Sequence, residues 1–503
     1  MSQEKNTSGV NLTGEDAAAT RRLIALLARN ARVLATAGIV ARLASLATAV
    51  VLARGLGERE FGRYVVAIAF ASLLSVFVNF GTGGYLVREV ARNPHLLGRT
   101  IGLVLSLRSA FGLTAIAAAA LVPPLLGYDR QTSTAIVLFT AAAALRSLGA
   151  TFQSGLQALE RLHDVASIQA QQAVLAAAAA LVVIAFGGGL IEVSWAAVAV
   201  AAVSVPWSWS RLRASWSDRI EFHLAGLPKT LPVIASFSGA VLFSTAITYL
   251  DSLLVNAFEG DEQTGLYGAA YRILVALYFI PTIYGTALAR SMSELAIANR
   301  EALAWLYSRA VCHLTVAALP LALFGLVGSH ALLATLYGES YADADVALAL
   351  LLSSVVFTFP AWIASTTAYA AGAERRVVAV VATSFTVNVA ANLVAIPAWG
   401  IEGAAAVNAI TEALTFALLL LILRRAGVRL GWRAALGKPV LAIAPSLVLV
   451  FTLPVPLGLR LVVGSVAYVA GLLLLRTFDA HDHEFLRSLT HFRESQPRVG
   501  LKS

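Results

Sequence analysis

The chain has 503 residues, of which 58% are hydrophobic and only 13% are charged, and its formal net charge is +9 at pH 7. Soluble globular proteins carry about 25% charged residues, so this composition excludes an ordinary soluble domain. The single cysteine, Cys312, excludes a disulfide framework and a cysteine-based metal site.

The amino-terminal segment, residues 1–32, is polar and contains no long apolar stretch. We therefore expect no cleaved signal peptide. From about residue 17 onward, four arginines alternate with apolar residues, a pattern that favours an amphipathic helix lying on the inner membrane surface.

Apolar segments of about 20 residues follow one another from residue 33 to residue 476. Each is long enough to cross a hydrocarbon core about 30 Å thick. The ten-residue alternation of a membrane β-barrel is absent, so we predict an all-α integral membrane protein. The fourteen predicted spans lie near residues 33–53, 64–86, 101–123, 133–156, 165–187, 190–210, 230–252, 265–289, 311–335, 346–370, 377–398, 402–423, 437–456 and 459–475.

The distribution of charge predicts the orientation of these spans. If the amino terminus is cytoplasmic, most of the 37 lysines and arginines fall in segments on the cytoplasmic side. This agrees with the positive-inside rule, and it places the carboxyl terminus in the cytoplasm as well. The net positive charge then lies beside anionic lipid, and we expect no nucleic-acid partner.

Two loops of the chain resemble each other. The stretch LARGLGEREFGRYVVA (Leu52–Ala67) joins spans 1 and 2, and LVNAFEGDEQTGLYGAAY (Leu254–Tyr271) joins spans 7 and 8. A second pair, ALERLHDVASIQAQQ (Ala158–Gln172) and GAERRVVAVVATSF (Gly372–Phe385), enters spans 5 and 11. We infer two parallel repeats of six spans each, related by an axis along the membrane normal, with a central cavity between them.

These repeats predict the organisation of the chain, and spans 13 and 14 are an added pair without a counterpart. The predicted parts are a cytoplasmic segment (1–32), an N-lobe with spans 1–6 (33–212), a cytoplasmic linker (213–229), a C-lobe with spans 7–12 (230–425), the added pair (426–476) and a cytoplasmic tail (477–503).

Several segments resemble the Wzx-like polysaccharide flippases of the multidrug/oligosaccharidyl-lipid/polysaccharide (MOP) exporter superfamily. They include ARGLGEREFGRYVVAIAFASLLSVFVNFGTGGYLVREVAR, YLDSLLVNAFEGDEQTGLYGAAYRI, YGESYADADVALALLLSS and NLVAIPAWGIEGAAAVNAITE. The resemblance covers about residues 30–425. It implies a bacterial inner-membrane flippase with a cationic cavity that moves undecaprenyl-diphosphate-linked oligosaccharide outward by alternating access. A polysaccharide polymerase or glycosyltransferases would then be partners.

Four arginines lie inside the predicted spans: Arg42, Arg108, Arg146 and Arg272. At about 2.5–3.5 kcal/mol each on insertion scales, four lipid-facing arginines would cost on the order of 10 kcal/mol. We expect them to face a wet cavity and bind the phosphates of an anionic lipid, because guanidinium groups bind phosphate oxygens through two parallel hydrogen bonds. The alternative is that some of them bond to carbonyl oxygens of neighbouring helices.

Candidate ion-coupling residues lie in the C-lobe. Glu412 is the one carboxylate deep within a span, and Asn388 and Asn392 are one turn apart on span 11. Asp251, at the outer end of span 7, is a further candidate, although it could instead pair with Arg272. We expect coupling to H⁺ or Na⁺ and no other cofactor, because oxygen ligands suit both ions. Alternatively, Glu412 bonds an arginine or an asparagine and never titrates.

Two other functions fit the class of protein. A multidrug-type exporter of the same superfamily is the first, but the N-lobe spans contain arginines and no deep acid, which favours an anionic substrate. The second is a membrane-embedded glycan polymerase or ligase. We expect no enzyme and no catalytic residues, because the outer loops are short and their acids, such as Glu259, Asp261 and Glu262, look like solvated helix caps.

Overall fold

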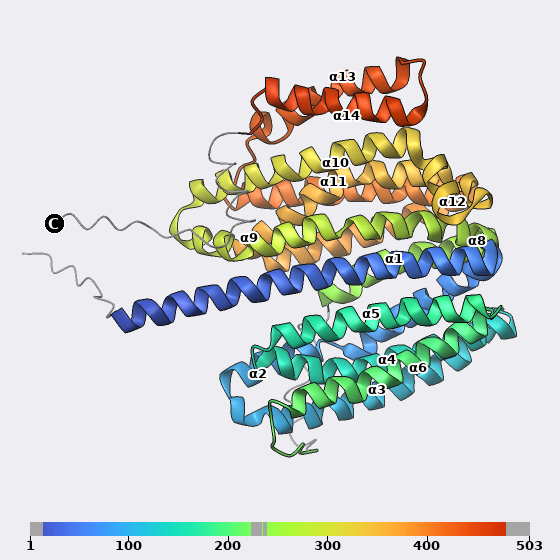
Figure 1. Ribbon diagram of the computed structural model, residues 1–503, viewed down its shortest axis with the longest axis vertical. Helices are drawn as coiled ribbons and strands as arrows, with labels where there is room; N and C mark the ends of the chain where they lie inside the picture. Colours follow the sequence, from blue (N-terminus) through green and yellow to red (C-terminus); the bar gives the residue numbers. More distant parts are fainter. Residues whose placement is uncertain (1–13, 223–233, 235–238, 479–503) are drawn as a thin grey trace, which may run out of the picture.

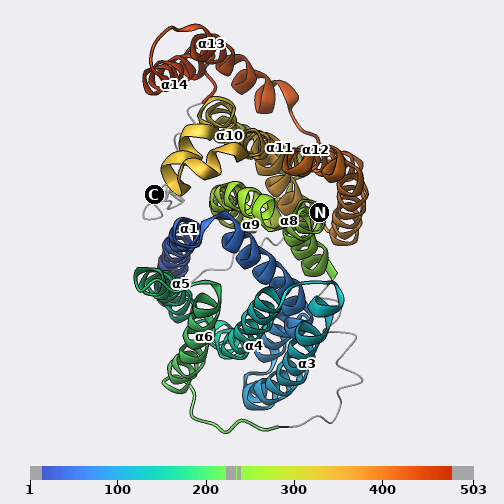
Figure 2. The same cartoon turned by 90° about the vertical axis from the view of Figure 1, so that its right-hand side faces the viewer.

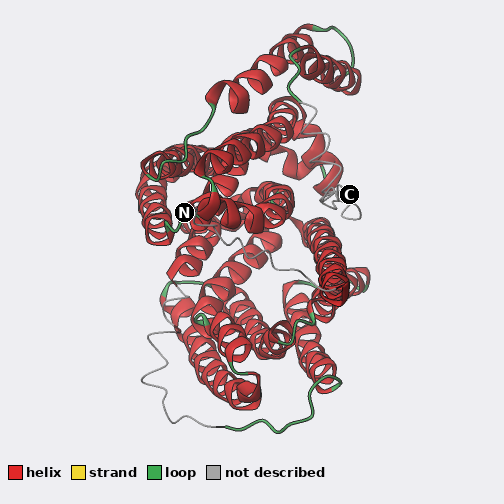
Figure 3. Cartoon of the chain, turned by 90° about the vertical axis from the view of Figure 1, so that its left-hand side faces the viewer, coloured by secondary structure: helices red, strands yellow, loops and turns green. Residues whose placement is uncertain are grey.

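A computed structural model of the chain describes residues 14–222, 234 and 239–478 (Figure 1). All the elements in this part of the chain are helical (Figure 3). Eleven of the described helical segments are long and apolar enough to cross a membrane. The predicted all-α membrane fold is thus confirmed.

The elements fall into two groups and an added pair. The first group comprises α1 (Gly14–Asn79), α2 (Thr82–Arg92), α3 (Leu97–Leu125), α4 (Arg130–Ala158), α5 (Leu162–Ala185) and α6 (Leu190–Arg213). The second comprises α8 (Gly239–Leu277), α9 (Phe279–Ala298), α10 (Arg300–Tyr337), α11 (Asp345–Ala370) and α12 (Glu374–Arg425). The added pair is α13 (Lys438–Thr452) and α14 (Leu457–Leu474), and the short turns are Pro94–Leu96, Glu339–Ala344 and Arg433–Gly437.

Three long helices are interrupted by residues with non-helical backbone angles. The breaks lie at Gly57 in α1, at Gly260 in α8, and at Trp399 and Gly400 in α12. They fall between predicted spans 1 and 2, 7 and 8, and 11 and 12. Treating each interrupted helix as two spans gives fourteen, which agrees roughly with the predicted number.

The amino-terminal part of the fold differs from the prediction. Residues 14–37 do not form a separate helix, because α1 runs without a break from Gly14 to the kink at Gly57. The start of predicted span 7, residues 230–238, lies outside the described residues except for Ile234. The expected tail beyond residue 478 also lies outside them.

The two groups of helices form two lobes, with α1 on the side of the N-lobe that faces the C-lobe (Figures 1 and 2). The extensive contacts between the lobes in the described residues involve α1, which packs mainly against α8 and also touches α9 and α10. The added pair packs on the far side of α10, where Leu323 joins an apolar cluster with Ile443 and Tyr468. The outermost helices therefore have no part in the contact between the lobes.

The repeated loops adopt the same local structure. Gly57 has φ 75° and ψ 172°, and Gly260 has φ 85° and ψ −173°. Both lie in the left-handed half of φ space, which glycine enters without the steric cost that a side chain would impose. Each glycine is followed five residues later by a second glycine and seven residues later by a tyrosine, so the similarity in sequence reflects a shared backbone turn.

These two loops pack against each other reciprocally. A Cβ atom on Gly62 would lie 1.7 Å from the carbonyl oxygen of Asp261, and one on Gly265 would lie 2.1 Å from that of Glu58. Gly62 and Gly265 are equivalent positions in the repeat, as are Glu58 and Asp261. A contact in which the same surface meets itself is what a two-fold axis produces, and here the axis passes between the lobes.

Polar links reinforce this reciprocal contact. Arg63 Nε lies 2.9 Å from Asp261 Oδ2 of the C-lobe, and its Nη2 lies 3.2 Å from Asp129 Oδ2 of the N-lobe. Asn256 also donates to Asp261 Oδ1, at 3.0 Å. The expectation that Asp261 is a solvated cap is therefore wrong, because it joins the two lobes.

The Asp129 carboxylate is ionised at neutral pH. Burial acts to raise its pKa, but hydrogen bonds from Thr132 and the charges of Arg63 and Arg59 outweigh burial and hold the pKa below its usual value. Its contribution to stability is therefore present above its unfolded pKa of about 3.9 and is lost as the pH falls through the lower folded value.

The kinked part of α1 also contacts the carboxyl end of α10 and the turn that follows it. Arg54 Nε donates to the carbonyl of Leu336 at 2.8 Å, and the hydroxyl of Tyr341 donates to the carbonyl of Ala53 at 3.0 Å. Arginine at a helix carboxyl terminus satisfies carbonyls that lack partners in the helix. The loop end of the molecule is thus closed by polar bonds as well as by apolar packing.

Candidate functional site

A cavity of about 570 Å³ lies within the N-lobe and reaches α8 of the C-lobe. Helix α4 lines it with Phe139, Ala143, Arg146, Ser147 and Ala150. These positions recur at intervals of three or four residues, which places them on one face of the helix. One face of α4 therefore forms a continuous wall of the cavity.

Helices α5 and α6 make the cavity wide. The lining face of α5 carries Ala173, Ala176, Ala179 and Ala180, and α6 adds Ala196 and Ala197. Alanine side chains end at Cβ, so these helices leave volume that larger residues would fill. The alanine-rich sequence of α5, which signals only a membrane span when read alone, thus creates the space for a ligand.

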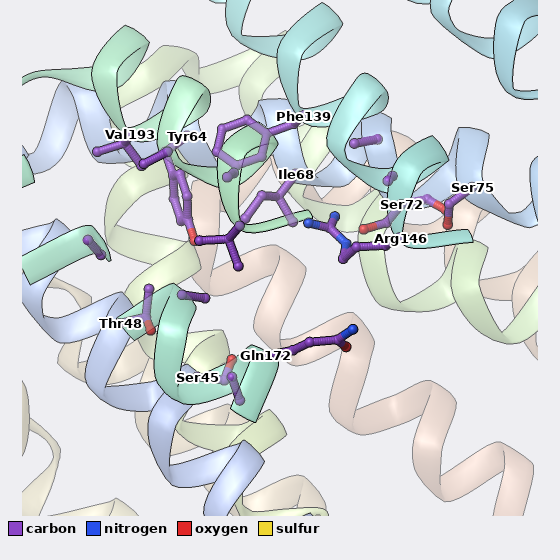
Figure 4. A pocket seen from close by; sticks show the side chains of 18 of the residues that line it. Ser45, Thr48, Tyr64, Ile68, Ser72, Ser75, Phe139, Arg146, Gln172 and Val193 are labelled. Carbon is purple, nitrogen blue, oxygen red and sulfur yellow. The ribbon is translucent and has the colours of Figure 1, made fainter. Parts of the chain in front are cut away.

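Two arginines are the charged residues in the cavity lining, Arg146 from α4 and Arg272 from α8. Neither guanidinium group has a hydrogen-bond or ion-pair partner among the residues that the structure describes. Tyr64 lies close enough to interact electrostatically with both, and Tyr249 interacts with Arg146. Figure 4 shows Arg146 extending into the space beside Ser72 and Ser75. The lining thus has a net charge of +2.

Arg42 is placed differently from the prediction. Its Nη1 donates to the carbonyl oxygen of Val275 on α8 at 3.3 Å, and Arg42 is not among the residues that line the cavity. The expected placement on the cavity is therefore corrected: this arginine bonds to a carbonyl across the lobe interface. A carbonyl beside a helix break or end is a suitable acceptor, because intrahelical bonds do not use all its capacity.

Arg108 is also absent from the lining and is buried between helices. Its Nε donates to Thr82 Oγ1 at 2.9 Å, and its Nη1 donates to the carbonyl of Ser147 and to Thr151 Oγ1 at 3.0 Å. These bonds join α2, α3 and α4. The correction has a physical reason: three nearby oxygens satisfy the guanidinium group, which therefore needs no ligand.

We expect Arg108→Ala to lower stability without removing the cavity charge. The change leaves two hydroxyls and a carbonyl without their donor, and a bond to a charged group contributes about 1.5–3 kcal/mol. The free energy of unfolding should fall by about 3 kcal/mol or more, and thermal unfolding in detergent should show a lower Tm.

Arg99→Ala is the matched control for this change, because Arg99 lies exposed on the first turns of the same helix. An Arg108→Ala protein with the Tm of the Arg99→Ala control but no ligand binding would instead assign Arg108 to the site.

The C-lobe holds a buried polar cluster. Asp251 on α8 accepts a hydrogen bond from Asn392 Nδ2 at 2.8 Å, and the same nitrogen lies 3.2 Å from Asn388 Oδ1. The three residues are at most 1% exposed. Asp251 thus pairs with Asn392, and the alternative pairing with Arg272 is not formed.

Glu412 lies apart from the cavity, on α12. Thr358 on α11 interacts with its carboxylate, and both Glu412 and Asp251 lie near Tyr271 and Tyr278. No bond from Glu412 to an arginine or an asparagine is present among the described residues. The four ion-coupling candidates therefore lie in one region of the C-lobe, and none of them lines the cavity.

The sequence model of a protein family described as "Polysaccharide biosynthesis protein" matches residues 27–296, more than half of the chain. The chain belongs to this family. The match begins within α1 and ends just before the end of α9, so it covers most of the N-lobe and the first two helices of the C-lobe, and it confirms the resemblance drawn from the sequence. No curated protein sequence matches the chain significantly.

Several solved structures share the fold of this chain. The lipid II flippase MurJ in an inward closed conformation has a TM-score of 0.74 and 14% identity, over 91% of this chain and 99% of that chain. An inward-facing multidrug resistance MATE family transporter of the MOP superfamily has a TM-score of 0.59 and 16% identity, over 77% and 94%. A MOP superfamily transporter from Pyrococcus furiosus has a TM-score of 0.56 and 15% identity, over 84% and 99%. At these identities the matches show the shared fold alone.

Reasoning from the sequence missed the uncharged part of the cavity. Ser72, Gln169, Gln172 and Tyr249 line it, yet none is unusual in composition or spacing. A helical-wheel projection of α5 could have found the two glutamines, because they lie on the same face of the helix as the alanines that line the cavity.

Proposed function

We propose that this protein is a flippase that moves an undecaprenyl-diphosphate-linked oligosaccharide from the cytoplasmic to the outer leaflet of a bacterial inner membrane. The observation that carries the proposal is the pair of unpartnered arginines, Arg146 and Arg272, in a cavity with no acidic lining residue. The match to a polysaccharide biosynthesis family supports the glycan part of the substrate.

A diphosphate suits this pair of arginines chemically. Each guanidinium group can donate two parallel hydrogen bonds to phosphate oxygens, and each phosphate of a lipid diphosphate sugar carries one negative charge. A cationic drug would instead meet two like charges, which disfavours the alternative of a multidrug exporter. The MurJ structure, whose name describes a lipid II flippase, supports transport rather than glycan synthesis or ligation.

The test is flipping by the purified, full-length protein in proteoliposomes. A fluorescent undecaprenyl diphosphate oligosaccharide is placed in the inner leaflet, and its arrival in the outer leaflet is followed by quenching with an impermeant reductant. Acceleration over protein-free liposomes, and over liposomes with heat-inactivated protein, supports the proposal. An equal rate in all three would refute it.

We propose that the cluster of Asp251, Asn388 and Asn392 couples transport to H⁺ or Na⁺, with Glu412 as a second candidate. Carboxylate and amide oxygens come together there, and no lysine or arginine among the described residues pairs with Asp251. Such oxygens suit either ion. The coupling ion would then bind within the C-lobe, whereas the anion would bind in the cavity, between Arg146 of α4 and Arg272 of α8.

Asp251→Asn should abolish the stimulation of transport by an ion gradient while leaving substrate binding within about twofold of the parent. The amide keeps the size of the side chain but removes its negative charge. Transport with and without imposed pH and Na⁺ gradients measures the effect, and Asp343→Asn, which changes an exposed acid, is the control. Gradient-driven transport at the parent rate would exclude Asp251 from coupling.

We further propose that both termini are cytoplasmic and that a polysaccharide polymerase or glycosyltransferases act with the flippase. In a protein with Cys312 replaced, a cysteine at Asp343 should react with an impermeant thiol reagent applied to intact cells. Cysteines at Arg92 or Arg376 should react only after the membrane is opened. All three positions are exposed. Labelling at Arg92 in intact cells would contradict this orientation.

A further inference from the structure

Beyond the two arginines, the cavity is lined by uncharged groups, and several have unused hydrogen-bonding capacity. The side chains of Ser72, Gln169 and Gln172 line it, and none of them makes a hydrogen bond to the described residues. Figure 4 shows Gln172 and Ser45 on the side of the space opposite Arg146 and Ser72. A polar side chain that lines a cavity and has no hydrogen bond within the protein can bind a ligand without breaking such a bond.

Neighbouring polar residues, by contrast, are held in place by the protein. Ser147 Oγ donates to Asn79 Oδ1 at 3.0 Å, and Asn79 Nδ2 donates to the carbonyl of Ser75 at 2.8 Å. Ser75 Oγ in turn donates to the carbonyl of Ser72 at 2.7 Å. This chain of bonds fixes one edge of the cavity, beside Arg146.

The charge balance of the cavity restricts what it can hold. The two guanidinium groups match the two negative charges of a lipid diphosphate sugar, and no further lining residue is charged. An additional carboxylate on the ligand would find amides and hydroxyls but no cation. A charge moved from water into such a site without a partner is penalised, so the site discriminates against it.

We propose that the sugar held next to the diphosphate is uncharged, and that Ser72, Gln169 and Gln172 bind its hydroxyl or acetamido groups. Amide side chains both donate and accept, as sugar hydroxyl groups do, so the two are complementary. This inference rests on the proposed function and narrows the substrate to lipid diphosphates whose first sugar is neutral.

The test compares two probes that differ in one group, undecaprenyl diphosphate N-acetylglucosamine and undecaprenyl diphosphate N-acetylglucosaminuronic acid, which carries a carboxylate in place of the C6 hydroxymethyl group. Binding to the full-length protein in nanodiscs of uncharged lipid is measured at pH 7.5, where the uronate is ionised. We expect the uronate probe to bind at least tenfold more weakly than the neutral probe.

Gln172→Arg should reverse this discrimination, because it places a third cation in the cavity. Gln157→Arg is the matched control, since Gln157 is exposed and lies outside the cavity lining. Gln172→Ala and Gln169→Ala should each weaken the neutral probe about two- to tenfold, the usual effect of one lost hydrogen bond. Undecaprenyl monophosphate, which carries no sugar, should bind these alanine variants as it binds the parent.

The outcomes separate the inference from the proposed function. Equal or tighter binding of the uronate probe by the parent, or unchanged discrimination in Gln172→Arg, would overturn the inference and leave the flippase proposal in place. A parent protein that binds neither probe would overturn both.

Discussion

Loss of both cavity arginines, in Arg146→Ala/Arg272→Ala, should weaken binding of a lipid diphosphate glycan by at least a hundredfold and stop measurable flipping. Each guanidinium group lines the cavity and has no hydrogen-bond or ion-pair partner in the described part of the chain, so a bound phosphate would supply the hydrogen bonds that it lacks. A charge-assisted bond contributes about 1.5–3 kcal/mol, which corresponds to roughly ten- to a hundredfold in the dissociation constant for each arginine.

The measurement is equilibrium binding of undecaprenyl diphosphate N-acetylglucosamine, followed by flipping in proteoliposomes. Arg146→Lys keeps the charge but loses the planar guanidinium group that donates two parallel hydrogen bonds, and it should give an intermediate affinity. Arg290→Ala is the control, because it removes the same charge from an arginine whose side chain is 76% exposed. Parent-like affinity in the folded double variant would show that the cavity does not bind the phosphates.

Gly62→Ala should hold the lobes apart at their loop end and reduce flipping at least tenfold. The new Cβ atom would lie 1.7 Å from the carbonyl oxygen of Asp261, and a backbone atom cannot rotate away as a side chain can. Overpacking of a close contact costs about 1–3 kcal/mol, and 1.4 kcal/mol changes a population tenfold. The closed arrangement should therefore lose population to one that is open at this end, which is the outer side in the orientation that we propose.

Accessibility of the cavity measures this effect. In a protein with Cys312 replaced, a cysteine at Ser72 should react faster with an impermeant reagent from outside when Gly62→Ala is present. Gly458→Ala is the matched control, because a Cβ atom there meets no atom within 4 Å. Unchanged labelling and flipping in Gly62→Ala would show that this contact does not close the outer route.

The helices were predictable because membrane burial is a property of single segments. The length and hydropathy of a 20-residue segment indicate a membrane span even when the helices that pack against it are unknown. The breaks at Gly57 and Gly260 were visible too, since both lie in polar loops with recurring glycines. A helix was expected from about residue 17, but its unbroken continuation into the first span was missed, because a change in hydropathy does not show whether the backbone turns there.

The site was less predictable than the fold, because the cost of a buried arginine does not say what satisfies it. Arg42 and Arg146 look alike in the sequence, yet Arg42 bonds to the carbonyl of Val275 and Arg146 faces the cavity. That difference depends on which oxygen lies nearby after the helices pack, and the spacing of residues along one helix does not contain it. The link from Arg63 to Asp261 was missed for the same reason, since its partners are 198 residues apart.

The reciprocal glycine contact has a further consequence. It is the interface that two identical chains would form in a symmetric dimer, here carried within a single polypeptide. In a homodimer every substitution appears in both subunits. In a single chain with two repeats, a substitution can occur in one repeat alone. Arg63 has Leu266 as its counterpart, so one salt link crosses the axis where strict symmetry would require two. The same freedom allows Arg146 to line a cavity in the N-lobe while Asp251 is buried in the C-lobe, a difference that two identical subunits could not have.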